Sequence, residues 1–371
     1  MAGKRQSFKH LCPKPRPPTP DPSPWSRGPH PGNGFAAGRG DVRLGPMGVR
    51  YIIGADENGL GPRLGPMTVT AVLARVTEGS ERVVTSKPRG GLKKRLGDSK
   101  ELVSHGNCAL GEAWTRALVE AGAGHEPAVG APRDPTALLE AVSLDPTAVL
   151  TSPCPKHVRG QCWSTEDESF CAPQQMGNFL KLVRKDLKRL AERGVEIMAV
   201  RTVVACTKRL NEAVGRGESR FVVDLHSMER LILHLRELAG EEISAECGKV
   251  GGFGQYGKVF GPLSGRLHMV VEEGRARSTY RFPGVGDIAF VRDGDASNIL
   301  VGMASLVGKY VRELLMGRIV RHYRRFDEAL PVVSGYHDPV TTRFIVGTEA
   351  LRKKRRVPAT CFERAPLHPK A

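Results

Sequence analysis

Residues 50–66, RYIIGADENGLGPRLGP, constrain the fold of this chain more than any other segment. Residues 51–53 are of types that favour a buried β-strand, and two adjacent carboxylates, Asp56 and Glu57, stand at its end. The glycines and prolines that follow require a tight turn, in which the backbone can approach a ligand closely. An ordinary acidic turn after an edge strand would explain the two acids alone. The glycines and prolines around them favour a functional loop.

Further motifs follow this loop in a fixed order, and together they resemble those of type 2 ribonucleases H (ribonuclease HII). Residues 56–62 with Gly65-Pro66 are similar to that family's Asp-Glu-x-Gly-Arg-Gly-Pro and Gly-Pro motifs. The other matching segments are 96–102 (LGDSKEL), 221–224 (FVVD), Gly294-Asp295, 304–309 (ASLVGK), Gly335-Tyr336 and Cys361-Phe362. The resemblance covers roughly residues 50–366 and is interrupted by long insertions.

The resemblance implies an α/β fold, with an RNase H-like mixed β-sheet flanked by helices, a C-terminal helical extension and inserted segments. We expect the catalytic domain over residues 50–330, insertions at about 105–172 and 240–285, and a basic helical extension over 331–371. Residues 1–49 contain ten of the 27 prolines and no periodic apolar pattern. Such a segment cannot bury enough surface to offset its conformational entropy, so we expect a disordered basic tail.

Alternating strand and helix patterns along the chain also predict a central sheet covered by helices. Expected strands are 67–76, 196–206, 220–224, 267–271, 279–282 and 287–291, and the first of these should form a hairpin with the strand before it. Expected helices are 175–193, 208–214, 227–238 and 296–316. Residues 105–172 have no clear pattern and are interpreted as an inserted subdomain or a flap.

The charge of the chain favours a polyanionic partner. Lys and Arg number 56 against 39 Asp and Glu, which gives a net charge of +17 and a pI near 9.8. Nucleic acid is the partner that this balance favours, and an anionic membrane surface is the competing one. No apolar run is long enough for a transmembrane helix, and the N-terminus has no signal-peptide pattern. We expect a cytoplasmic monomer.

Eight cysteines without close pairing favour a reducing compartment over a disulfide framework. One local group, Cys154, His157, Cys162 and Cys171, leaves two alternatives open. The first is a zinc site of unfamiliar spacing. The second, which the absence of a CxxC pair favours, is a set of free thiols in an irregular insertion.

The resemblance identifies Asp56, Glu57, Asp224 and Asp295 as the catalytic acids and as the ligands of two Mg²⁺ or Mn²⁺ ions. Hard divalent cations prefer carboxylate oxygens, and a pair of such ions suits phosphodiester hydrolysis. The implied reaction is cleavage of the RNA strand of an RNA/DNA hybrid, or 5′ of a ribonucleotide in duplex DNA, with 5′-phosphate products. The resemblance implies that these acids lie together in the fold, which their spacing in the sequence does not show.

The resemblance also implies substrate contacts, which we assign to Gly59, Leu60, Gly61, Arg63, Ser99, Lys100, Lys309 and Tyr336. The family senses a 2′-hydroxyl with its Gly-Arg-Gly backbone and a tyrosine, and Tyr336 matches that tyrosine. Leu60 departs from the family arginine and cannot make a bidentate phosphate contact. Arg63 is the candidate replacement, while Lys93, Lys94, Arg95 and the run 352–356 are candidates for phosphate contact or for a solvated surface.

Two other functions stay open. The first is a nucleic-acid-binding protein that keeps the fold but has lost turnover, which Leu60 and the insertions would explain. The second is a nuclease of the same fold that acts on structured DNA. The glycine-rich segment 248–265, with Phe253, Tyr256 and Phe260, has two interpretations of its own: an aromatic platform for bases, or a loop held by its own packed aromatics, which we favour.

Overall fold

The computed structural model describes residues 48–125, 131–249 and 254–366. Its centre is a seven-stranded sheet in the order β3-β2-β1-β4-β7-β6-β5. The strands are β1 (Val49–Asn58), β2 (Met67–Thr77), β3 (Val195–Ala205), β4 (Ile243–Gly248), β5 (Met269–Glu273), β6 (Arg277–Phe282) and β7 (Gly286–Val291). The pairs β1–β4 and β4–β7 are parallel, and the other neighbours are antiparallel. The predicted α/β class, with a mixed sheet flanked by helices, is confirmed.

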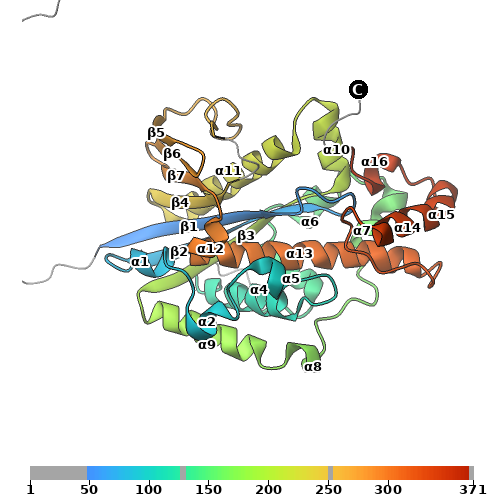
Figure 1. Cartoon of the computed structure of the whole chain (residues 1–371), viewed down its shortest axis with the longest axis horizontal. Helices are drawn as coiled ribbons and strands as arrows, with labels where there is room; N and C mark the ends of the chain where they lie inside the picture. Colours follow the sequence, from blue (N-terminus) through green and yellow to red (C-terminus); the bar gives the residue numbers. More distant parts are fainter. Residues whose placement is uncertain (1–47, 126–130, 250–253, 367–371) are drawn as a thin grey trace, which may run out of the picture. The chain divides into compact units, whose positions relative to one another are not determined.

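Helices cover both faces of this sheet (Figure 1). The longer ones are α4 (Ala109–Gly122), α5 (Pro135–Val142), α9 (Phe179–Ala191), α10 (Thr207–Gly215), α11 (Arg220–Ala239), α13 (Ile299–Arg324) and α14 (Pro339–Gly347). The short ones are α1 (Glu81–Val84), α2 (Gly90–Lys93), α3 (Ser99–Leu102), α6 (Thr147–Thr151), η1 (Lys156–Val158), α7 (Arg159–Trp163), α8 (Pro173–Met176), α12 (Gly294–Ser297), α15 (Glu349–Lys354) and α16 (Ala359–Phe362).

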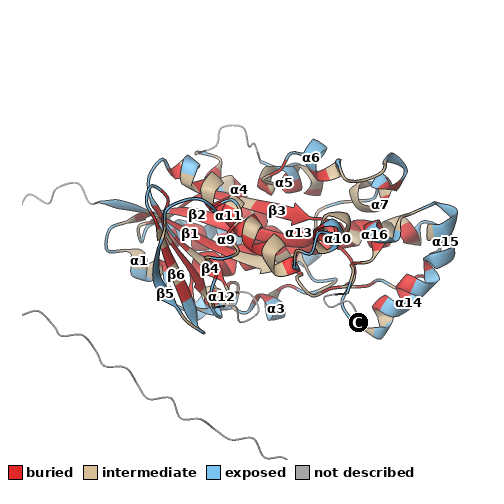
Figure 2. Ribbon diagram, turned by 90° about the horizontal axis from the view of Figure 1, so that it is seen from above, coloured by how far each residue is buried: buried red, intermediate tan, exposed pale blue. Residues whose placement is uncertain are grey.

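Alternation along β1 divides the buried side chains between two cores. Ile53 and Ala55 belong to the core that α11 covers, whereas Ile52 belongs to the core formed with α4, α9 and α13. Figure 2 shows buried residues along the strands and along α13. Because successive residues of a strand point to opposite faces, Asp56 follows Ile52 and Gly54 to the α13 face, and Glu57 follows Ala55 to the α11 face.

Helix α13 lies directly against β1. A Cβ on Gly54 would collide with the backbone of Leu300 and Val301, so only glycine permits this approach. Further along the helix, the Asn58 amide donates to the carbonyl of Ser305 at 3.1 Å, and the Thr68 hydroxyl donates to that of Gly308 at 2.9 Å. The start of α13 is thereby fixed beside the carboxyl end of β1.

Most of the expected elements are present, and the hairpin β1–β2 is confirmed. One expected strand was wrong: residues 220–224 form the first turns of α11, not a strand. The Ser219 hydroxyl caps this helix by accepting from the Val222 amide, and buried Leu225, Met228 and Ile232 continue a helical spacing. The β-branched Val222 and Val223 had suggested a strand, but packing against the sheet overrides that local preference.

Two segments interpreted as insertions contribute to the core, so that interpretation was wrong in part. Strand β4 falls within 240–285 and lies between β1 and β7. Helix α4 falls within 105–172, and its Trp114 is fully buried and donates to the carbonyl of Arg95 at 2.6 Å. In the loop after β4, buried Tyr256 and Phe260 pack with Tyr280, which confirms the packing interpretation for these two aromatics; Phe253 and nearly all of the tail 1–49 lie outside the described residues.

Candidate active site

Asp56 and Glu57 occupy the carboxyl end of β1, where the parallel neighbour β4 also ends. Residue 248 of β4 stands beside Asp56, and a Cβ on Gly248 would collide with the Asp56 Oδ1. Glycine at this position therefore leaves room for the Asp56 carboxylate. It also means that β4 offers no carboxylate directly beside Asp56.

Asp224 reaches the site from α11 instead of from a strand. Its side chain is fully buried, and neither of its carboxylate oxygens has a hydrogen-bond partner. Burial raises the pKa of Asp224 well above its usual range, and the charge of Asp56 raises it further. A buried carboxylate without a donor is unfavourable on its own, so Asp224 is a residue that could hold a positively charged ligand.

Asp295 lies in α12, the short helix between β7 and α13. The turn before it contains Asp293 in a left-handed conformation, with φ of 55°. Asn298 then begins α13, because its Oδ1 accepts from the backbone amides of Leu300 at 2.9 Å and Val301 at 3.3 Å. These turns hold Asp295 at the edge of the sheet where β1 and β4 end.

The charges of these acids act on one another. Burial raises the pKa of Glu57 to about 8, with Asp224 the largest of its charged causes, and Asp295 adds to the effect. Burial likewise raises the pKa of Asp56 well above its usual range, and the charges of Glu57 and then Asp295 contribute, while the Ser305 hydroxyl opposes the change. Asp56, Glu57 and Asp224 are therefore close enough to disfavour one another's ionisation, and the charge of Asp295 acts on Asp56 and Glu57.

The four acids match a hard divalent cation in their chemistry, since all their donors are oxygens and two of these are buried without a partner. The side chains do not form a closed cage: within the described ranges, no three His, Cys, Asp or Glu side chains come together in a way that could hold a metal ion. Asp224 and Glu57 lie on the α11 face, whereas Asp56 points to the α13 face. Ligation would require these side chains to converge.

Glu246 of β4 is a further acid of this region that the sequence interpretation missed. It pairs with Gly54 in the parallel register, on the α13 face of the sheet. Its Oε1 is 3.9 Å from the position that a Cβ on Gly294 would take, and its Oε2 is 3.5 Å from a guanidinium nitrogen of Arg277. The signal was the alternation of Ile243, Ala245 and Cys247, which had not been recognised as a strand.

Buried arginines donate hydrogen bonds to the backbone of the glycine-proline loop, residues 59–66. Arg364 donates to the carbonyls of Gly59 at 2.6 Å and Gly65 at 2.7 Å, and Arg220 donates to that of Leu60 at 3.1 Å. Arg312 lies so close to Gly59 that no side chain would fit there, and the positive φ of 83° at Gly59 also requires glycine. The shape of the loop is thus set by contacts from α11, α13 and the C-terminal segment.

Leu60 and Arg63 are both engaged within the protein. Leu60 packs against the core on the α11 face. The Arg63 guanidinium forms an ion pair with Glu363 at 2.7 Å and donates to the Thr342 hydroxyl at 3.0 Å. As placed here, Arg63 ties the loop to the C-terminal segment and is not free to replace the family arginine.

Tyr336 stands beside the same loop and remains accessible. Its ring is 45% exposed, and the Arg312 guanidinium lies over it at 4.7 Å. The preceding carbonyl of Gly335 accepts from the backbone amides of Arg63 and Leu64. A second contact joins the two segments, since Nε2 of His337 is 3.2 Å from the carbonyl oxygen of Gly61. The loop and the tyrosine therefore form one surface.

Of the other predicted substrate contacts, Ser99 and Lys309 bind within the protein, whereas Lys100 faces solvent. Ser99 is buried and accepts from the Ser305 hydroxyl at 3.0 Å, while the Lys309 ammonium donates to the Ser99 carbonyl at 2.8 Å. Burial lowers the pKa of Lys309. Lys100 is exposed and its charge lowers the pKa of Glu57, so it is the member of this group that lies beside the acids and faces solvent. Glu313, whose charge also acts on Lys309, pairs with Arg312 and His105.

The four candidate zinc ligands of the sequence are not brought together. The His157 ring faces the carbonyl of Arg356 at 3.1 Å, and Cys171 lies beside Glu112, whose carboxylate accepts from its backbone amide at 2.9 Å. The pKa of Cys162 is raised to about 12, chiefly by burial, and its thiol neighbours are Cys206, Cys154 and Cys361. The thiols that the structure describes are free.

Two of the expected phosphate contacts also serve the fold. Arg95 forms an ion pair with the buried Asp186 at 2.6 Å. In the basic run 352–356, the Arg352 guanidinium lies over the Phe362 ring and that of Arg355 over Phe326, each at 4.0 Å. These side chains fix helices to one another, so the free positive charge of the surface lies elsewhere.

No family model and no curated protein matches this sequence. Among solved structures, the chain is similar to ribonuclease HII of Archaeoglobus fulgidus, solved in a complex with PCNA, with 14% identity, a TM-score of 0.35, and coverage of 86% of this chain and 98% of that one. It is also similar to Bst-RNase HIII in complex with Mn²⁺, with 11% identity, a TM-score of 0.34, and coverage of 82% of this chain and 72% of that one. A third similar structure is ribonuclease H2 of Pyrococcus horikoshii OT3, with 13% identity, a TM-score of 0.33, and coverage of 84% of this chain and 92% of that one. Similarity at this level does not assign the chain to a family. Within the described ranges, no helix is long and apolar enough to cross a membrane.

Proposed function

We propose that this protein is a divalent-metal-dependent nuclease that cleaves the RNA strand of RNA/DNA hybrids or a ribonucleotide embedded in duplex DNA. The observation that carries the proposal is the group of acids at the carboxyl end of β1, Asp56, Glu57, Asp224 and Asp295, in which burial and neighbouring acids raise the pKa of the first three. Acids perturbed in this way cluster at functional sites, and a bound cation would offset their repulsion. Their order along the chain also matches the ribonuclease HII motifs.

Mg²⁺ or Mn²⁺, held by these four carboxylates with Glu246 as a further candidate, would activate the attacking water and neutralise charge on the leaving oxygen. Asp224 would turn its two unpartnered oxygens toward the ions. Glu57 would have to release the proton that its raised pKa favours, so occupation of the site and ionisation of Glu57 would be coupled. Lys100 would favour the ionised form of Glu57 and attract the phosphate backbone.

The substrate class follows from the surface beside these acids. The backbone of Gly59 and Gly61, with the exposed ring of Tyr336, would contact the sugar of the scissile nucleotide, where a 2′-hydroxyl distinguishes RNA from DNA. Because Leu60 stands where an arginine would hold a phosphate, discrimination between RNA and DNA would rest on the loop backbone and on Tyr336. We therefore expect this protein to prefer continuous RNA/DNA hybrids over single ribonucleotides in DNA.

Replacement of Asp56 or Asp224 by Asn tests this function. Each change should abolish cleavage of an RNA/DNA hybrid in Mg²⁺ or Mn²⁺ and leave the circular dichroism spectrum unchanged. Glu328→Gln, an exposed acid beyond the end of α13, is the matched control and should cleave normally. Turnover near that of the wild type in both Asn variants would remove the assigned site.

A second candidate is a nucleic-acid-binding protein that no longer cleaves. Two observations favour it: β4 offers glycine beside Asp56, and the acids of the described residues do not form a closed metal cage. Tight binding of hybrids in EDTA, with no product in either metal, would support this candidate over the nuclease.

A further inference from the structure

A basic cavity lies away from the acids, between the segment that follows α1 and the end of α9. Its volume is about 550 Å³. Apolar walls are provided by Val83, Leu92, Leu190 and Ile299, and its only neutral side chain with a polar atom, Ser86, donates to the carbonyl of Val83. Asp186, the buried acid of the lining, is compensated by its ion pair with Arg95.

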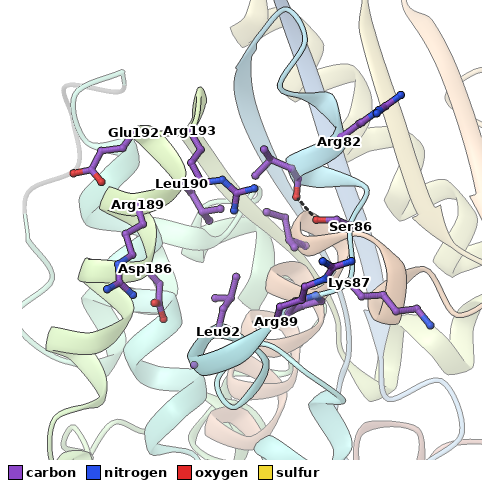
Figure 3. Close-up of a pocket in the computed structure, with 14 residues that line it drawn as sticks. Arg82, Ser86, Lys87, Arg89, Leu92, Asp186, Arg189, Leu190, Glu192 and Arg193 are labelled. Carbon is purple, nitrogen blue, oxygen red and sulfur yellow. Dashed lines mark hydrogen bonds between the residues drawn. The ribbon is translucent and has the colours of Figure 1, made fainter.

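Five cations surround this cavity: Arg82, Lys87, Arg89, Arg189 and Arg193. All five are exposed, and none forms an ion pair among the described residues. Figure 3 shows the guanidinium groups of Arg193 and Arg89 directed into the cavity, while Lys87 and Arg82 extend outward from its rim. The one exposed acid of the lining, Glu192, points away from Arg193 in the same view.

Further exposed cations lie next to the cavity residues in the sequence. Lys93, Lys94 and Lys100 follow Leu92, and the charge of Lys100 acts on Glu57 of the candidate active site. On α9, exposed Lys181, Lys185 and Lys188 precede Arg189. This number of cations exceeds what a small ligand needs, and it suits a polymer with a charge at every repeat.

From this arrangement we infer that the Arg89–Arg193 cavity binds the phosphodiester backbone of a nucleic acid, outside the cleavage site and without regard to sequence. Apart from its charged side chains, the lining has only the Ser86 hydroxyl to offer, and not the mixed neutral donors and acceptors by which proteins recognise a base. Its inward groups are guanidinium ions, which bind phosphate oxygens as paired donors. The identity of the polymer rests on the function proposed above, and the contact itself does not.

The simpler explanation is that Arg189 and Arg193 only complement the carboxyl end of α9, where basic residues stabilise a helix by about 0.3–1 kcal/mol. Arg89 does not fit that explanation, because it comes from the segment between α1 and α2. The two accounts make different predictions for nucleic-acid binding in salt.

The test compares Arg89→Gln/Arg193→Gln with the wild-type full chain. Binding of a labelled all-DNA duplex and of a hybrid is measured by fluorescence anisotropy in EDTA over a range of salt. Loss of two phosphate contacts should lower the slope of log K against log salt by about 2 and weaken binding severalfold to a hundredfold at low salt, equally for both duplexes. The control is Arg266→Gln/Arg275→Gln, two exposed arginines beside the edge strand β5.

An unchanged slope in the Arg89/Arg193 variant, with the wild type binding normally, would overturn the inference and leave the proposed nuclease intact. An equal loss in the control would also overturn it, because the effect would then be one of net charge. If the slope is lower in the Arg89/Arg193 variant and the wild-type protein cleaves no substrate, the phosphate contact is supported and the proposed nuclease is not. Equal unfolding midpoints in urea exclude a folding defect.

Discussion

Glu57→Gln should stabilise the metal-free protein at alkaline pH. A carboxyl whose pKa is raised in the folded state binds its proton more tightly there than in the unfolded chain, so stability falls as pH rises between the two pKa values. For Glu57 these are about 4.5 and about 8. The contribution of Glu57 to stability should thus decline from about pH 5 to pH 8 and then level off, and the glutamine removes this contribution to the decline.

The magnitude follows from the same two values. A difference of about 3.5 in pKa corresponds to at most about 5 kcal/mol. Asp56 and Asp224 share the repulsion and can relax when Glu57 is neutral, so we expect about 2–3 kcal/mol above pH 8 and nearly none at pH 5. Mn²⁺ should reverse the order, because the wild type retains the better set of ligands.

Urea unfolding at pH 5, 7 and 8.5, with EDTA or Mn²⁺, measures these differences. Glu237→Gln, an exposed acid on α11, is the control and should change stability by less than about 0.5 kcal/mol at every pH. The reasoning is refuted if Glu57→Gln is no more stable than the wild type at pH 8.5 in EDTA.

Further predictions concern the scaffold and Glu246. Gly54→Ala should lower the free energy of unfolding by about 2 kcal/mol or more, because the added Cβ would collide with the α13 backbone. The control is Gly215→Ala in α10, where an added Cβ meets nothing, and it should be neutral or stabilise the protein by up to about 1 kcal/mol. Urea unfolding measures both changes. Arg364→Met leaves the loop carbonyls unpaired and should cost about 2–4 kcal/mol in the same assay, with a smaller cost for Lys. Glu246→Gln should weaken Mn²⁺ binding in calorimetry if Glu246 is a metal ligand, and unchanged affinity would exclude that role.

The sequence predicted the elements whose pattern is local. Strands β1, β2 and β3 and helix α13 follow from apolar periodicity, and the glycine-proline turn predicted the first hairpin. The start of α11 was misjudged because Val222 and Val223 favour strands, and their helical state depends on burial against the sheet. β4 was overlooked because it is short and its glycine-rich surroundings resemble a loop.

The site could be predicted only in part, for a similar reason. Asp56 and Glu57 are adjacent, so their role could be inferred from one motif. Asp224 was chosen as the end of a strand but reaches the region from a helix, and its proximity to the other acids depends on tertiary packing. The opposing charges that hold Arg63 and Arg95, Glu363 and Asp186, lie far away in sequence, so no local pattern showed that these arginines were occupied.

One measurement tests the central claim most directly. Three labelled duplexes, an RNA/DNA hybrid, a DNA duplex with one ribonucleotide and an all-DNA duplex, are incubated with the wild type and with Asp224→Asn in Mg²⁺, Mn²⁺ or EDTA. We predict metal-dependent cleavage of the hybrid with 5′-phosphate products, weaker cleavage at the single ribonucleotide, none of the all-DNA duplex, and no cleavage by Asp224→Asn. Equal cleavage of all three duplexes, cleavage in EDTA, or no cleavage of the hybrid in either metal would contradict the account.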